Sequence, residues 1–178
     1  ITPELQSFTD ELAEYLGLSR QEMLIQLIKE GIKNAKQTLT EEEKVDEAEA
    51  PQQQSNATRF YLLNTNKSND LNDHETMLRE GIAAAFYGDW KFKINDLKQG
   101  DIVFLYGNAE GIVAYGQASG ETIARDHKNK KNECHYQKLG GFTRLEPAIS
   151  AANIKKILGY NIPFLNTMRR IKKKKKIM

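Results

Sequence analysis

The chain has 178 residues, of which 39% are hydrophobic and 28% are charged, a composition that predicts a mostly globular protein with a charged exterior. No run approaches the roughly 18 apolar residues of a membrane-spanning helix, and residues 1–10 carry neither a basic leader nor an apolar signal core, so export is not expected. Cys134 is the only cysteine, which excludes an intramolecular disulfide and fits a reducing compartment. We therefore expect a cytoplasmic location and a buried or idle thiol.

The net charge of +2 is unevenly distributed. Residues 40–50 contain six acidic residues against the single Lys44, whereas residues 169–176 are almost wholly basic. A basic tail of this kind is either simply solvated or drawn to a phosphate backbone through counterion release.

The first 39 residues predict a small helical module. Apolar residues recur at three- and four-residue spacing from Leu5 to Leu16 and again from Leu24 to Ala35. Gly17 is predicted to end the first helix as a left-handed cap, and the run from Ser19 to Glu22 has the form of a capping box. Two helices of about 14 and 18 residues cannot bury both apolar faces alone, so we expect a homodimer formed through them.

Residues 40–57 are predicted to form an acidic flexible linker. The apolar pattern stops here, and a composition rich in Glu, Gln and Ala buries too little surface to offset the entropy of ordering. The first half can prolong the preceding helix for a few turns, and Pro51 should stop it.

Residues 58–178 predict a mixed second module, with many short strands, two helices and a basic tail. Asp73 is expected to cap a helix that continues through Ala85, and Ser150 a shorter helix with Ile154, Ile157 and Leu158 on one face. The predicted strands are Arg59–Asn64, Ile102–Tyr106, Ile112–Ala118, Glu121–Arg125, Cys134–Lys138 and Phe142–Leu145. The predicted fold class is α+β, with a small curled β-sheet or barrel flanked by helices.

The segment from Ile1 to Lys36, with its Leu-Gly-Leu-Ser-Arg junction, resembles the helices of ribbon-helix-helix repressors. The resemblance implies a dimer whose paired N-terminal strands enter the DNA major groove. That strand is largely missing, because the chain begins at Ile1-Thr2-Pro3. Either the strand has been cut away or the module only dimerises, and we favour the former.

The same resemblance implies that Ser19, Arg20 and the free amides of the second helix contact a DNA phosphate. The alternative is that Ser19 only caps the helix and Arg20 is solvated.

The segment from Arg59 to about Ile171 resembles the EVE and ASCH branches of the PUA-like superfamily. The resemblance rests on LKQGDIVFLYG at Leu97–Gly107 and GIVAYGQASGE at Gly111–Glu121. Ile149–Gly159 and Asn166–Ile171 are similar to the closing helix and strand of such domains. The resemblance implies a cleft for an unmodified or a modified base, frequently one flipped out of its helix, in DNA more than in RNA.

A base pocket needs aromatic faces and groups that donate and accept hydrogen bonds. Phe86, Tyr87 and Trp90 place three aromatic rings within five residues, and Asn64 ends the first predicted strand. These four are our candidate pocket residues. The alternative is that Phe86, Tyr87 and Trp90 belong to the core, as we expect of Tyr106 and Tyr115.

A basic loop at residues 125–132 is the second candidate surface. We expect contacts with a nucleic-acid backbone from six residues of this loop and of the C-terminal segment, namely Arg125, Lys128, Lys130, Lys131, Arg169 and Arg170. A solvated loop is the alternative.

Catalytic motifs with diagnostic spacing are absent from the sequence. His74-Glu75, Asp126-His127 and Glu133-Cys134-His135 contain suitable residue types only, so we predict no enzyme, no metal site and no cofactor. The favoured function is a DNA-binding regulator or sensor. The alternatives are an antitoxin-like repressor whose second domain binds a protein partner, and a nuclease acting on modified DNA.

Overall fold

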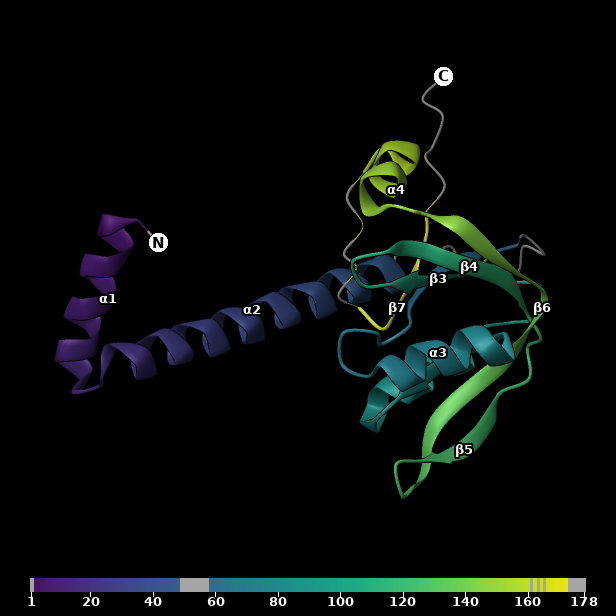
Figure 1. Ribbon diagram of the computed structural model, residues 1–178, viewed down its shortest axis with the longest axis horizontal. Coiled ribbons are helices and arrows are strands. Elements are labelled where there is room, and N and C mark those ends of the chain that lie inside the picture. Colours follow the sequence, from purple (N-terminus) through teal and green to yellow (C-terminus); the bar gives the residue numbers. More distant parts are fainter. Residues whose placement is uncertain (1, 49–57, 161, 163, 165, 173–178) are drawn as a thin grey trace. The chain divides into compact units, whose positions relative to one another are not determined.

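The computed structural model describes residues 2–48, 58–160, 162, 164 and 166–172. The chain divides into two compact units, Ile1–Gln54 and Ser55–Met178. The first is helical, and the second is a mixed α+β domain built on a curled sheet (Figure 1). None of the described helices combines the length and apolar character that crossing a membrane requires.

The helical unit consists of α1 (Pro3–Leu16) and α2 (Arg20–Ala48). The predicted boundary is confirmed: Gly17 adopts a left-handed φ of 66°. The backbone N–H of Ser19 donates to Glu22 Oε2 over 2.9 Å, and the N–H of Glu22 donates to Ser19 Oγ over 3.3 Å. This pair of bonds is a capping box.

Helix α2 has 29 residues, more than the 18 predicted. Its extension through Ala48 is rich in Glu, Lys and Ala, which are good helix formers. The first half of the predicted linker is therefore helical, and residues 49–57, including Pro51, lie outside the described residues.

The sheet of the second unit has the strand order β2-β6-β4-β3-β1-β7, with β5 paired to β6. Only β1 and β3 pair in parallel among these neighbours; the other pairs are antiparallel. The elements are β1 (Phe60–Asn64), α3 (Leu71–Glu80), β2 (Ile82–Phe86), the 3-10 helix η1 (Gly88–Asp96), β3 (Ile102–Gly107), β4 (Gly111–Ala118), β5 (Ile123–His127), β6 (Lys130–Ile149), α4 (Ala151–Leu158) and β7 (Met168–Arg170). The two strands predicted at Ile102–Tyr106 and Ile112–Ala118 thus pair as a hairpin, at the centre of the sheet.

Strand β6 curls the sheet. Its 20 residues include both segments that we predicted as separate strands, Cys134–Lys138 and Phe142–Leu145. The first half pairs with β2 and β5 and the second half with β4. Gly141, between the halves, has a φ of 59°, a conformation that glycine adopts without strain. One strand therefore pairs with neighbours in two parts of the sheet.

The two faces of the sheet carry separate cores. On β1, Tyr61 and Leu63 pack into the larger core with Met77 of α3, whereas Leu62 packs into the smaller core with Ile154 of α4. This is the alternation expected of a strand buried on both faces. Helices α3 and α4 consequently cover opposite faces of the sheet (Figure 1).

Two predictions about α3 are wrong. Its N-cap is Asp70, whose side chain accepts from the N–H of Asn72, and Asp73 is a buried residue of the first turn. The helix ends at Glu80 and does not continue through Ala85. Gly81 turns the chain, and the next five residues pair with β6 as the buried strand β2. Backbone pairing and burial on the sheet thus override the helix propensity of the alanines.

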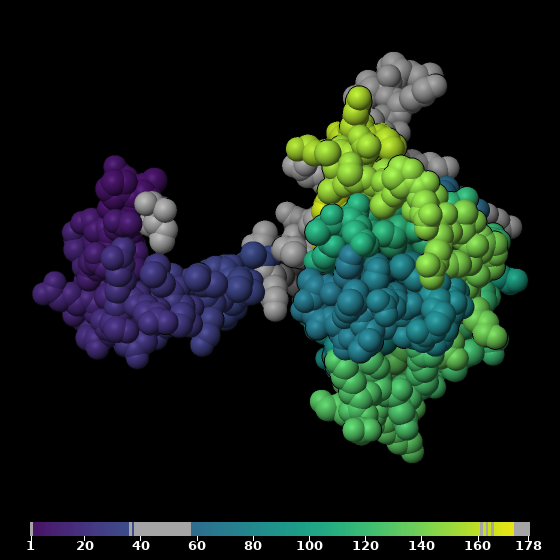
Figure 2. Space-filling model, in the orientation of Figure 1, coloured from purple at the N-terminus to yellow at the C-terminus, as the bar shows by residue number. Residues whose placement is uncertain are grey.

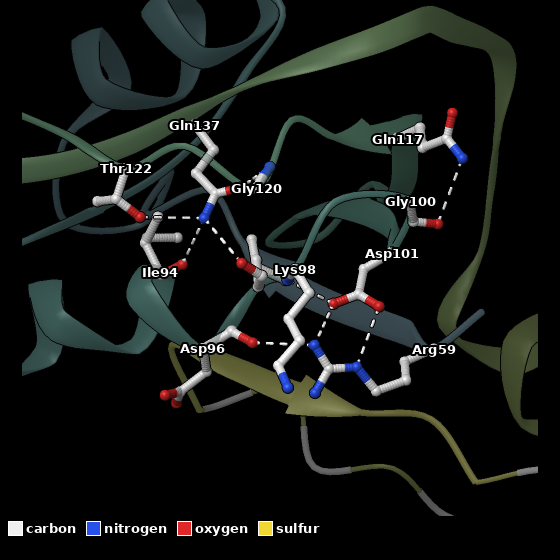
Figure 3. Close-up of polar contacts among 11 residues, drawn as sticks. Arg59, Ile94, Asp96, Lys98, Gly100, Asp101, Gln117, Gly120, Thr122 and Gln137 are labelled. Atoms are coloured by element: carbon white, nitrogen blue, oxygen red, sulfur yellow. Dashed lines mark hydrogen bonds and ion pairs between the residues drawn. The ribbon is translucent and has the colours of Figure 1, made fainter. Parts of the chain in front are cut away.

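Buried polar side chains fix the turn before β3 (Figure 3). Asp101 accepts two bonds from the guanidinium of Arg59, from Nε over 3.0 Å and from Nη2 over 2.5 Å. Gln137 is fully buried; its Nε2 lies 3.0 Å from the carbonyl oxygens of both Ile94 and Leu97. Gln137 thereby bonds the backbone carbonyls at the end of η1, so we assign this cluster a structural role.

Candidate functional site

A cavity of about 100 Å³ opens where β1, β2 and the segment before β7 meet. Its lining residues are Asn64, Asn66, Asn69, Ala84, Ala85, Phe86 and Thr167. The two alanines leave space that larger side chains of β2 would fill. A volume of this size has room for several water molecules, and the wall combines an aromatic ring with three amide side chains.

Hydrogen bonds fix the orientation of these amides. Asn64 donates from Nδ2 to the carbonyl of Phe164 over 2.9 Å and accepts at Oδ1 from the N–H of Asn66 over 2.9 Å. Asn66 donates from Nδ2 to Asp73 Oδ2 over 2.8 Å and accepts at Oδ1 from Asn69 Nδ2 over 2.7 Å. An ionised carboxylate only accepts, so Asp73 fixes Asn66, and Asn66 fixes Asn69. The Oδ1 atom of Asn69 accepts from no donor in the described parts of the chain.

A polar network supports the cavity wall from behind. Asp73 is buried, and its Oδ1 lies 3.3 Å from His127 Nε2. The hydroxyl of Tyr87 lies 3.1 Å from the same nitrogen, and the His127 ring packs 4.8 Å from the ring of Phe86. The β5–β6 hairpin is thereby held against the first turn of α3.

Three potential metal ligands lie within this network. One donor atom each from Asp70, Asp73 and His127 lies within 4.8 Å of the others. Asp70, however, is hydrogen bonded to Lys128, which lowers the pKa of the carboxyl, and the same bond raises the pKa of Lys128. A cation entering here would compete with Lys128, so we assign the cluster to fastening the hairpin.

The structure brings together two of the four predicted pocket residues. Asn64 and Phe86 both line the cavity, although Phe86 is also a core residue with only 7% of its surface exposed. Tyr87 instead contacts His127. Trp90 lies in η1 with 52% of its surface exposed and is not among the lining residues.

Some of the side chains in the 125–132 loop that we expected to contact a nucleic-acid backbone pair with other side chains of the protein. Arg125 pairs with Glu80 over 2.8 Å and lies over the ring of Tyr136. Lys128 pairs with Asp70, whereas Lys130 and Lys131 are exposed at the start of β6.

Arg169 and Arg170 lie on β7, at the edge of the sheet, with Arg170 exposed. In the helical unit, Ser19 caps α2, and Arg20 pairs with Asp10 over 3.2 Å at the surface.

Asn66, Asn69, Asp73 and His127 are site residues that the sequence analysis did not select. A signal for the asparagines was present, since Asn64, Asn66 and Asn69 fall within the six residues 64–69 at the end of the first strand. No sequence signal indicated His127, because only the folded hairpin brings it close to Asp73, which lies 54 residues earlier in the sequence.

Comparison with known proteins gives limited similarity. No protein-family profile matches the chain, and no curated protein matches it. Among solved structures, the NMR structure of Rpa0253 from Rhodopseudomonas palustris is 20% identical, with 56% of this chain and 71% of that chain covered and a TM-score of 0.36. The crystal structure of PSPTO5229 from Pseudomonas syringae is 14% identical, with 61% and 89% covered and a TM-score of 0.38.

Proposed function

We propose that residues 58–178 form a PUA-like domain of the EVE or ASCH type, which binds nucleic acid and receives an unstacked base in the cavity at Asn64. On this proposal the N-terminal unit is a ribbon-helix-helix-like module that dimerises and contacts DNA. The whole protein would then act as a DNA-binding regulator or a sensor of modified bases.

The convergence of three asparagine side chains and Phe86 on one small cavity carries this proposal. The edge of a base presents donors and acceptors side by side, and an amide offers both. The asparagines are also held in fixed orientations, which lowers the entropic cost of binding a planar ligand. Phe86 lines the same cavity, so an apolar ring is available beside the amides.

The test compares the full chain with Asn69→Ala on duplexes that are identical except for one position, which carries either a base or an abasic sugar. Asn69 is exposed, and its free Oδ1 is the acceptor expected to meet the base. Loss of one hydrogen bond of about 1 kcal/mol should weaken binding of the base-containing duplex about fivefold, with no change for the abasic duplex. Fluorescence anisotropy provides the affinities.

Asn72→Ala is the matched control, since Asn72 is an exposed asparagine of α3 whose side chain makes no hydrogen bond within the described residues. Its affinities should equal those of the unmodified chain. If the unmodified chain binds base-containing and abasic duplexes equally for every base tried, base reading in this cavity is wrong.

A protein partner is the second candidate, favoured by the exposure of Trp90 and Phe92, at 52% and 47% of their surfaces. Large aromatic residues exposed together are typical of protein interfaces. In that case Trp90→Ala would release a co-purifying protein while the base-dependent affinity stays unchanged.

A further inference from the structure

The charges of the chain are segregated along the sequence. All 24 acidic residues precede residue 147, whereas residues 147–178 contain nine of the 26 basic residues and no acidic residue. The first 146 residues therefore carry a formal net charge of −7 and the last 32 a charge of +9. A polyanion is attracted to the C-terminal segment and repelled by the average of the rest.

The described part of this segment forms an open groove beside α4. The groove has a volume of about 540 Å³ and is lined by Ala152, Lys155, Lys156, Gly159 and Tyr160. Lys155 and Lys156 are exposed in the last turn of the helix and form no ion pair within the described residues. Ala152 and Gly159 leave the floor of the groove open. Figure 2 shows the segment around α4 standing out from the surface of the second unit.

The β5–β6 hairpin makes a weaker electrostatic surface than its sequence indicates. Arg125 is paired with Glu80 and Lys128 with Asp70, so two of its four predicted contacts are already neutralised. Binding phosphates through these two residues would first require breaking their ion pairs. The groove beside α4 carries no such cost.

The groove and the cavity at Asn64 share one connecting segment, between α4 and β7. Tyr160, which lines the groove, accepts at its hydroxyl from the N–H of Lys172 over 3.1 Å, so the chain after β7 is fastened at the end of α4. Thr167, from the same connection, lines the cavity, and its carbonyl accepts from the N–H of Asn64 over 2.9 Å.

We infer that the groove beside α4 binds the phosphodiester backbone of a nucleic-acid strand, through Lys155 and Lys156. The inference rests on the proposed function and extends it, because it assigns the path of the strand that delivers the base. Lysines hold phosphates as point charges and release condensed counterions, which demands no exact geometry and suits an open groove.

The test uses the full-length chain with Lys155→Gln and Lys156→Gln combined, and measures affinity for a single-stranded oligonucleotide of mixed sequence between 50 and 200 mM salt. The plot of log K against log salt falls with a negative slope. Two lost phosphate contacts should make this slope shallower by about 1.4 and lower the affinity about tenfold at the low-salt end. Lys98→Gln with Lys138→Gln is the control. It removes the same charge from exposed positions of the second unit, and its slope should stay steeper than that of the groove variant.

An unchanged slope in the groove variant overturns the inference, above all if Lys130→Gln with Lys131→Gln reduces it instead. Anionic phosphatidylserine vesicles form a further arm: if the groove variant loses vesicle binding but keeps oligonucleotide binding, the groove is a membrane surface. Failure of the proposed function alone gives a different result. The slope of the groove variant would still become shallower, but the unmodified chain would bind base-containing and abasic duplexes equally. A chain that binds no oligonucleotide at 50 mM salt contradicts both.

Discussion

At the scale of single residues, His74 shows how burial sets chemistry. Its Nδ1 lies 2.7 Å from Thr65 Oγ1, whose hydroxyl donates to the carbonyl of Tyr106 over 3.1 Å. Because that hydroxyl proton is already used, His74 donates from Nδ1 to Thr65 Oγ1. Burial is the main cause that lowers the pKa of His74 below its ordinary value of 6.5, and the attraction of Glu110 opposes this only in part.

The lowered pKa predicts a stability that falls on acidification. Below pH 6.5 the unfolded chain takes up a proton at His74 before the folded chain does, so unfolding becomes easier as the pH falls from 7.5 to 5.5. The urea midpoint, followed by the fluorescence of the single Trp90, should therefore be lower at pH 5.5. His74→Asn keeps a donor near Nδ1 but does not titrate, so its midpoint should change less. His135, whose pKa is also lowered by burial, contributes equally to both proteins. An equal change of the urea midpoint in the two proteins would therefore contradict this role of His74.

At the scale of elements, the junction of α3 and β2 is the place where sequence and structure differ most. The Ile-Ala-Ala-Ala run after Gly81 favours a helix by propensity, yet it forms a strand without a solvent-exposed face. Gly81 makes the change of direction with a φ of 63°, and its N–H bonds to the carbonyl of Met77. Phe142 of β6 packs directly against this glycine.

Gly81→Ala should therefore destabilise the second unit by about 2 to 4 kcal/mol. The positive φ costs an L-residue about 1 to 2 kcal/mol, and the added methyl group would lie 3.1 Å from Cγ of Phe142, which adds a crowding cost. Gly141→Ala is a control for the backbone alone, because its φ is 59° and no atom lies within 4 Å of the added carbon. Urea unfolding followed by Trp90 fluorescence measures both. Equal losses would show that Phe142 yields without cost.

At the scale of the whole molecule, the helical unit leaves much of its apolar surface uncovered. In the described chain, α1 and α2 bury Ala13 and Met23 but expose Phe8, Ile28 and Ile32, each by more than half. We propose that a second copy covers this surface, as the resemblance to ribbon-helix-helix proteins implies. Two helices packed only on each other otherwise form a poor core.

Ile28→Glu should then shift the protein from dimer to monomer. Burial of an isoleucine contributes about 1.5 to 3 kcal/mol, so the dimer dissociation constant should rise at least tenfold. Sedimentation velocity over a range of protein concentrations measures the shift. Leu71→Glu is the matched control, since Leu71, on α3 of the other unit, is an apolar residue with 52% of its surface exposed, against 60% for Ile28. A monomeric unmodified chain at all concentrations would exclude the dimer.

Local sequence by itself determined the features that depend on neighbours along the chain. The α1–α2 boundary follows from Gly17 and the capping box at Ser19, and the β3–β4 hairpin follows from turn residues between two apolar runs. The mixed α+β class follows from the same local patterns. Each involves groups only a few residues apart.

Only the tertiary structure decided how distant segments meet. The cavity joins Asn64, Phe86 and Thr167 from three separate parts of the chain, and the Asp73–His127 contact exists because β5 and β6 fold back onto α3. The sequence analysis selected Asn64 and Phe86 by residue type but also Trp90, which lies exposed on η1. Residue type indicates what a side chain can bind, whereas its position in the curled sheet decides which other groups bind with it.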